Sequence, residues 1–273
     1  MKKQKSNFAL SWEIIVILFI SNIFVFIFIL SPFDHLKDLI DKSTFGWLFF
    51  FYIPCLLALF YTIVWRRFLV RSYFKIEFQD WYRYILFIST MVGLSLLALV
   101  IISKVKIPST LLVLDRINIT TKNFSYLFYI KMVIIAPILE EIIFRGYILN
   151  GFLTRYNSYL AIGLSSIFFA FFHFNLYQFI YTFFLGFFCG WYFYRTKNLL
   201  SCIFIHSIFN FLGISVFKYF FDKVKYQVIN TDTKIFNIEH PWLVLFISLC
   251  LITVSVYLLN ISVKRIHSIN KEA

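Results

Sequence analysis

A series of long apolar runs, separated by short segments that hold most of the charged residues, constrains the fold of this chain more than any other feature. A run of about 20 residues matches the hydrocarbon core of a bilayer, and a segment in lipid must satisfy its own backbone hydrogen bonds, which a helix does. Eight such runs are present, at about 11–30, 45–65, 82–102, 124–150, 159–174, 179–194, 199–216 and 241–261. The sequence therefore predicts an all-α protein, a polytopic transmembrane helical bundle of about eight spans.

Composition excludes the main alternatives. With 61% hydrophobic and only 14% charged residues, the chain is too apolar for a soluble domain. The net charge of +13 does not indicate nucleic-acid binding, because the basic residues are scattered between apolar runs, where they anchor helix ends at a lipid surface. The four cysteines show neither a C-x-x-C pair nor zinc spacing, so we expect no disulfide framework.

The charged flanks predict an orientation and a domain division. Lys2, Lys3 and Lys5 precede the first run, and no small-residue cleavage site follows it, which favours a retained signal anchor. The distribution of Lys and Arg predicts a cell-membrane protein with both termini on the cytoplasmic side. The heavy use of Phe, Ile, Lys and Asn indicates a bacterial source. We divide the chain into a three-span region at 1–123, a four-span core at 124–216, and an outer loop, last span and tail at 217–273.

Polar side chains inside the runs of the core are costly in lipid and predict a functional site. Helical spacing of four residues places Glu141 and Arg145 on one face, and likewise His206 and Asn210. If the fourth and fifth runs form a hairpin near Asn157, Glu140 and His173 lie at one level. The candidate catalytic residues are Glu140, Glu141, Arg145, His173, His206 and Asn210.

Structural explanations exist for each signal taken alone. A single histidine in a span is more often a helix-to-helix contact, and Glu141 with Arg145 alone would be a structural ion pair. Pro137 could kink its helix and expose a carbonyl, with or without a function. Gly186 and Gly190 form a G-x-x-x-G pattern that predicts close packing within the bundle. Because the polar residues occur on three helices at compatible depth, we favour a site.

The same residues resemble a known family. E-E-x-x-F-R-G at 140–146, F-x-x-x-H at 169–173 and H-x-x-x-N at 206–210 are similar to the three motifs of the CPBP intramembrane proteases, also called Abi. That family comprises type II CAAX prenyl endopeptidases and proteins of bacteriocin processing or immunity. The resemblance covers about 124–216.

The resemblance implies a role for each residue. Glu140 corresponds to the glutamate that activates water, and His173 to the histidine that helps to position that water. His206 and Asn210 correspond to the pair that stabilises the oxyanion, while Glu141 and Arg145 support them. Amide hydrolysis needs such a base and such donors.

Two mechanisms stay open. Glu140, His173 and His206 would also supply three zinc ligands, leaving one position for water. The H-E-x-x-H spacing is absent, so we favour a metal-independent glutamate mechanism that requires no cofactor. The chain lacks G-x-S-x-G, G-x-x-x-x-G-K and G-x-G-D patterns, and it shows no internal repeat typical of a transporter.

We therefore expect an intramembrane endopeptidase whose partners are the bilayer and a membrane-embedded or membrane-associated peptide or protein substrate. The alternative is a non-catalytic membrane protein that binds a peptide or confers immunity to a bacteriocin. An intact set of two glutamates and two histidines favours the enzyme.

Overall fold

The computed structural model describes residues 2–30, 44–65, 75–104, 126–173, 176–228 and 240–272, and every regular element in these ranges is a helix. The predicted loops that determine the topology, and the predicted domain boundary at 123–124, lie largely outside the described residues. Each predicted span coincides with a helix or a continuous helical stack. The helices are α1 (Lys2–Leu30), α3 (Thr44–Phe60) with its π-helical end η1 (Tyr61–Trp65), α4 (Trp81–Lys104), α5 (Tyr126–Ile130), η6 (Lys131–Ile135), α6 (Ala136–Glu141), η7 (Ile142–Leu149), α7 (Asn150–Phe152), α8 (Ser158–Phe171), α9 (Leu176–Thr196), α10 (Leu199–Val228) and α11 (Pro241–Glu272).

Three of the described helices contain a segment that is long and apolar enough to cross a membrane. These segments are Asn7–Phe24 of α1, Trp81–Ile101 of α4 and Pro241–Lys264 of α11. Shorter apolar helices occur at Tyr52–Val64, Ser158–Phe171 and Leu199–Ser215. The prediction of an all-helical membrane protein is confirmed, whereas the number of eight spans stays a prediction.

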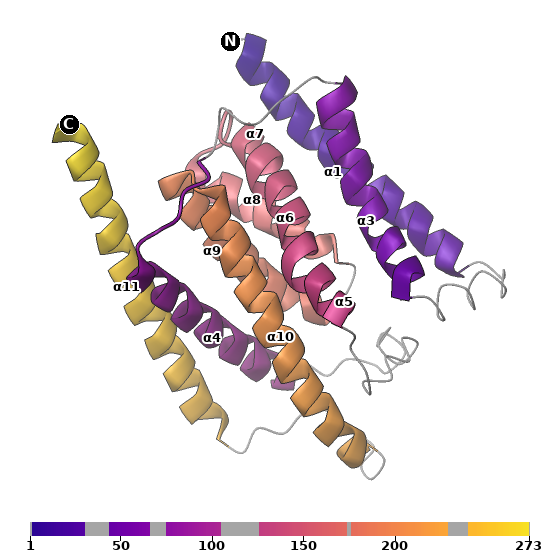
Figure 1. Ribbon diagram of the computed structural model, residues 1–273, viewed down its shortest axis with the longest axis vertical. Coiled ribbons are helices and arrows are strands. Elements are labelled where there is room, and N and C mark those ends of the chain that lie inside the picture. Colours follow the sequence, from indigo (N-terminus) through magenta and orange to yellow (C-terminus); the bar gives the residue numbers. More distant parts are fainter. Residues whose placement is uncertain are drawn as a thin grey trace.

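The helices form a central group with a pair on either side (Figure 1). The continuous stack from α5 to α7 packs with α8, α9 and α10 in the centre, α1 and α3 lie together on one side, and α4 packs along α11 on the other. The first turn of α1 and the last turn of α11 lie toward the same end of the bundle (Figure 1). The central group holds all the motif residues.

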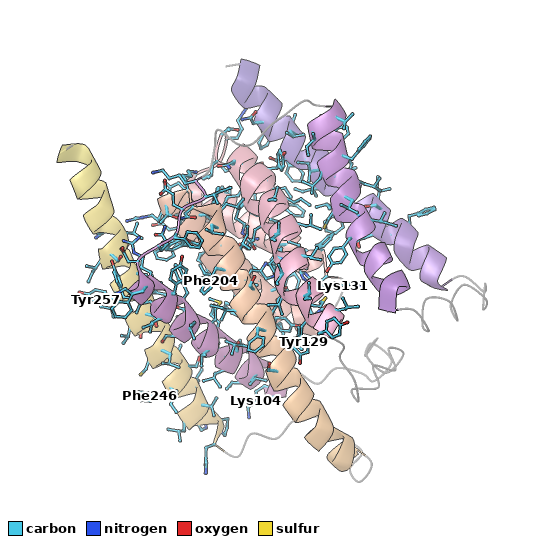
Figure 2. All side chains as sticks on the ribbon, in the orientation of Figure 1. Lys104, Tyr129, Lys131, Phe204, Phe246 and Tyr257 are labelled. Atoms are coloured by element: carbon cyan, nitrogen blue, oxygen red, sulfur yellow. The ribbon has the colours of Figure 1, made fainter. Side chains whose placement is uncertain are left out.

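The outer helices expose large apolar side chains on their surface, whereas the central helices bury theirs. Phe246 and Tyr257 on α11 are 66% and 65% exposed and are labelled in Figure 2, whereas Phe144, Phe169 and Tyr192 in the central group are fully buried. Aromatic side chains fill the centre by edge-to-face contacts, such as that between Phe144 and Phe169, whose ring centroids lie 5.0 Å apart. The buried centre therefore gives the motif residues a rigid surrounding.

Glycines allow α9 to approach α8 closely. A Cβ at Gly186 would lie 3.2 Å from Cα of Ser166, and a Cβ at Gly190 would lie 3.1 Å from Cγ2 of Ile162. Small residues at such crossings permit backbones to approach each other. The prediction that this G-x-x-x-G pattern serves packing inside the bundle is confirmed. The four cysteines are free.

Polar contacts join α4 to α11 and join the segment before α4 to the centre. Arg83, only 4% exposed, donates from Nε to Oγ of Ser262 on α11 at 2.7 Å. The segment before α4 pairs with the turn between α9 and α10, where the Lys75 amide donates to the Lys197 carbonyl at 2.6 Å. Lys197 has φ of 55°, and this left-handed residue directs the chain from α9 into α10.

Candidate active site

A buried ion pair forms the base of the motif cluster. Arg145 in η7 is 1% exposed, and its Nε lies 3.0 Å from Oε2 of Glu141, the last residue of α6. The guanidinium also donates from Nη2 to the Gly186 carbonyl at 3.2 Å and lies 4.7 Å from the ring centroid of Phe169. A buried charge is stable only when it is paired, and Glu141 supplies the counter-charge. Nε and Nη1 of Arg145 and Oε2 of Glu141 have no hydrogen-bond partner among the described residues, so their contact is an ion pair.

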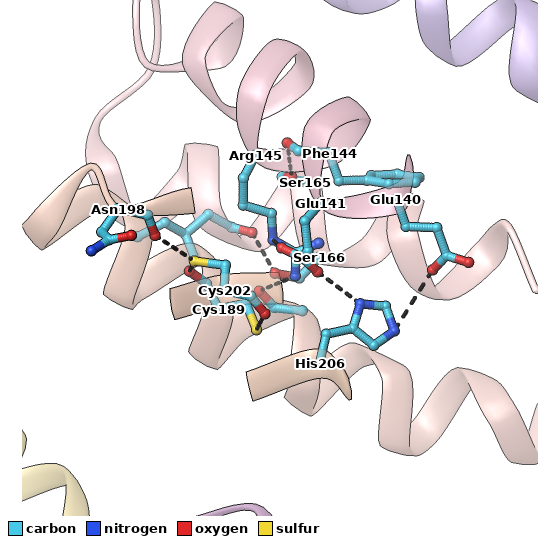
Figure 3. Close-up of polar contacts among 12 residues, drawn as sticks. Glu140, Glu141, Phe144, Arg145, Ser165, Ser166, Cys189, Asn198, Cys202 and His206 are labelled. Carbon is cyan, nitrogen blue, oxygen red and sulfur yellow. Dashed lines mark hydrogen bonds and ion pairs between the residues drawn. The ribbon is translucent and has the colours of Figure 1, made fainter. Parts of the chain in front are cut away.

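The other oxygen of Glu141 orients a histidine. Its Oε1 lies 2.9 Å from Nδ1 of His206 on α10 (Figure 3). The carboxylate that forms the ion pair with Arg145 offers only lone pairs, so Nδ1 carries the proton and donates it to Glu141. The second ring nitrogen, Nε2, is then directed toward Glu140.

The second histidine is held in the same way by a different acceptor. Nδ1 of His173, two residues after the end of α8, lies 2.9 Å from the Phe169 carbonyl, one turn earlier. A carbonyl only accepts, so Nδ1 carries the proton here as well. In the neutral ring, Nε2 of His173 therefore presents a lone pair.

The Glu140 carboxylate lies between the two rings. Its Oε2 is 3.8 Å from Nε2 of His206 and 3.9 Å from Nε2 of His173, and the residue is 4% exposed. These distances exceed a direct hydrogen bond, and Oε2 has no hydrogen-bond partner among the described residues. Three elements, α6, α8 and α10, thus bring one carboxylate oxygen and two imidazole nitrogens to a common point.

Asn210 takes a different position from the rest of the motif set. It lies one turn beyond His206 on α10, and its Nδ2 donates to the Met132 carbonyl in η6 at 2.8 Å. Pro137, five residues after Met132, has no amide proton, so it cannot make the i to i+5 bond of a π-helical turn. Asn210 therefore satisfies a carbonyl that the proline leaves without its backbone partner.

Two residues of α3, far from the motifs in the sequence, also border the site. Tyr52 donates from its hydroxyl to the Lys131 carbonyl at 2.9 Å, and both Tyr52 and Cys55 lie within electrostatic range of Glu140. Neither Tyr52 nor Cys55 has a charged residue three or four positions away in the sequence. No sequence pattern therefore predicts that they lie near the site. Only the packing of α3 against α6 places them here.

The carboxylate and imidazole groups of this site are of the types that bind zinc, but the distances between them are longer than those between the ligands of a tetrahedral zinc ion. Tetrahedral zinc with bonds of about 2.0–2.2 Å holds ligand atoms about 3.4 Å apart, and Glu140 Oε2 lies 3.8 and 3.9 Å from the two Nε2 atoms. Among the described residues, no group of three His, Cys, Asp or Glu side chains is arranged to hold a metal ion. We therefore derive no catalytic step through a metal.

The site thus places a buried carboxylate beside two oriented imidazoles in an apolar helical bundle, where polar groups are costly and point to a functional site. Residues 122–212 match the family model described as type II CAAX prenyl endopeptidase Rce1-like. The resemblance expected from the three motifs is confirmed, and the matched range contains all six candidate residues. Comparison with curated proteins and with solved structures finds no match.

Proposed function

We propose that the protein is an intramembrane endopeptidase that hydrolyses a peptide bond in a membrane-embedded or membrane-associated substrate. The family match supports a peptidase of membrane substrates. The observation that carries the chemistry is the position of Glu140 Oε2 between the Nε2 atoms of His173 and His206. Both rings are fixed by their Nδ1 atoms, so the three groups are oriented before substrate arrives.

In this proposal Glu140 is the base. Separations of 3.8 and 3.9 Å are suited to a water that bridges Oε2 and a ring nitrogen at about 2.8 Å from each. Glu140 takes a proton from that water, the resulting hydroxide attacks the scissile carbonyl carbon, and the proton passes to the leaving amine as the C–N bond breaks. His173 positions the water through its Nε2 lone pair.

His206 stabilises the developing oxyanion. Because its Nδ1 proton is directed at Glu141, it donates from Nε2 only as an imidazolium, and the Glu141 carboxylate compensates that charge. Arg145 holds Glu141 in place, and the two carboxylates Glu140 and Glu141 together balance the charges of Arg145 and the imidazolium. Asn210 has a second amide proton in addition to the one it donates to Met132, and we assign it a supporting role at the oxyanion.

We also propose eight spans with both termini in the cytoplasm, a bacterial origin and a mechanism without a metal. The absence of an H-E-x-x-H spacing supports the mechanism without a metal. The coincidence of each predicted span with a helix supports the proposal of eight spans.

Purified protein incubated with a panel of membrane peptides, including a C-terminally prenylated one, tests the function. We expect cleavage by the wild type, loss of about 10²-fold or more in kcat for Glu140→Gln, and no effect of a strong chelator. Glu77→Gln, at an exposed glutamate before α4, is the matched control. Chelator-sensitive cleavage would replace the glutamate mechanism with a metal mechanism. If no peptide is cleaved and Glu140→Gln still protects cells against a toxic peptide, the non-catalytic immunity function replaces the protease.

A further inference from the structure

The π-helical segment η7 has an unusual set of side-chain partners. Five consecutive carbonyls in it each lie within hydrogen-bonding distance of a side-chain donor. Ser165 Oγ donates to Phe144 O at 3.3 Å, Asn150 Nδ2 to Arg145 O at 3.2 Å and Gly146 O at 3.0 Å, and Ser11 Oγ approaches Tyr147 O at 3.4 Å and Ile148 O at 3.2 Å. A π-helix replaces i to i+4 bonds by i to i+5 bonds, so its carbonyls are open to such donors.

Two of these carbonyls are reached from α1, which is outside the range that matches the family model. Ser11 is fully buried, and its hydroxyl lies among Asn7 O of its own helix and the two carbonyls of η7. The hydroxyl has one proton, which the three acceptors share. Ser11 is thus a polar contact between α1 and the helix that carries Glu141 and Arg145.

The close approach of α1 depends on Gly151 in α7. A Cβ built at Gly151 would lie 1.7 Å from Oγ of Ser11 and 2.5 Å from the Asn7 carbonyl. No other residue type leaves space for the hydroxyl at this point. Gly151 and Ser11 therefore fit together as one contact, just after the end of η7.

We propose that Ser11 is a positioning residue for the hydrolysis, acting by holding η7 in its π-helical register. A change between α and π turns rotates every later side chain about the helix axis relative to Glu141. Arg145 lies inside η7 and Glu141 just before it, so their ion pair, and through it the His206 ring, depends on that register. This inference rests on the proposed function, because hydrolysis is the reaction that the register serves.

A pair of serines on the same helix provides the test. Ser21 of α1 donates only to carbonyls of its own helix, Ile17 O and Leu18 O, among the described contacts. We expect Ser11→Ala to lower kcat about 10-fold with KM unchanged, because misplaced catalytic groups slow the chemical step. Ser21→Ala is expected to stay within about twofold of the wild type in both constants.

A spectroscopic measurement separates this inference from the proposed function. In protein labelled with ¹⁵N in its histidine rings, the Nδ1 signal of His206 reports the bond to Glu141 whether or not any substrate is cleaved. We expect Ser11→Ala to shift this signal and Ser21→Ala to leave it in place. If the wild type cleaves nothing, the proposed function fails, and the His206 signal still decides the role of Ser11.

A second pair of variants tests the same contact between α1 and η7 without replacing Ser11. Gly151→Ala forces α1 away from η7 and is expected to shift the same His206 signal, whereas a Cβ at Gly163 meets nothing within 4 Å and Gly163→Ala is expected to be silent. Equal His206 signals in the wild type, Ser11→Ala and Gly151→Ala would overturn the proposal. So would a kcat for Ser11→Ala equal to that of Ser21→Ala.

Discussion

A hydrogen bond of 2.9 Å joins Nδ1 of His206 on α10 to Oε1 of Glu141 on α6. The two residues lie 65 positions apart in the sequence. The same carboxylate holds Arg145 through its other oxygen at 3.0 Å. Glu141 is thus the residue that links a buried cation to the ring facing Glu140. This relationship assigns the two adjacent glutamates different tasks, Glu141 in orienting His206 and Glu140 in the proposed chemistry.

Replacing Glu141 tests this division of tasks. Glu141→Gln leaves Arg145 without its counter-charge and lets the His206 ring turn, so we expect kcat to fall about 10²-fold. Breaking a buried pair from one side also costs about 3–5 kcal/mol of stability. Enzyme kinetics and thermal unfolding in detergent measure both effects.

The double variant Glu141→Gln/Arg145→Gln separates charge from orientation. Removing both charges together avoids an unpaired buried ion, so stability should recover in part while activity stays low. Activity in Glu141→Gln within twofold of the wild type would contradict the assigned role of this residue.

Asn210 and Pro137 form a second testable pair. Asn210→Ala leaves the Met132 carbonyl without its side-chain donor and is expected to cost about 1–3 kcal/mol. Pro137→Ala restores a backbone amide, which can bond to a carbonyl one turn earlier. The double variant should therefore regain stability, as measured by thermal unfolding.

The activity of that double variant determines what Asn210 does. If Asn210 contributes a donor to the oxyanion, Pro137→Ala/Asn210→Ala regains stability but not kcat. Recovery of kcat together with stability would show that Asn210 acts only by satisfying the Met132 carbonyl.

The crossing of α8 and α9 should not tolerate a methyl group at Gly186. Its Cβ would lie 3.1–3.2 Å from atoms of Phe169 and Ser166, and the glycine carbonyl accepts from Arg145. We expect Gly186→Ala to lose about 1–3 kcal/mol of stability and part of the activity. Gly163→Ala on α8, where the space is open, is the control, and equal melting temperatures for the two variants would contradict the prediction.

Lys197, in the turn between α9 and α10, predicts a dependence of stability on pH. Burial lowers the pKa of Lys197 below its usual 10.5, although its Nζ donates to Asn150 Oδ1 at 3.4 Å. Between the lowered pKa and 10.5 the unfolded chain binds more protons at this lysine than the folded protein, so this group makes stability rise with pH across that window.

Thermal unfolding from neutral to alkaline pH tests this effect. Lys197→Met should remove the contribution of Lys197 and flatten the rise relative to the wild type. Lys75→Met, at a lysine whose side chain is 56% exposed, should leave the profile unchanged. A Lys197→Met profile that parallels the wild type would refute the prediction.

The sequence by itself determined the helical class and the members of the cluster. Apolar runs of bilayer length leave a chain few alternatives to helices, because lipid offers no partner for backbone groups. Spacing of four residues placed Glu141 with Arg145, and His206 with Asn210, because one helical turn is a local property. The three motifs also predicted the resemblance to type II CAAX prenyl endopeptidases that the family model matches at residues 122–212.

Only the tertiary structure decided which atoms meet. Helical spacing put Asn210 on the face of His206, yet its amide contacts Met132, because the π-helical turn and Pro137 leave that carbonyl accessible. Ser11 of α1 contacts η7, and Tyr52 of α3 contacts η6, in the continuous stack that carries Glu140 and Glu141. Lipid-facing helices are apolar all round, so no polar stripe in the sequence reveals which face is buried or which neighbour it contacts. Those pairings depend on how the helices pack, and a buried hydrogen bond between helices exists only after they do.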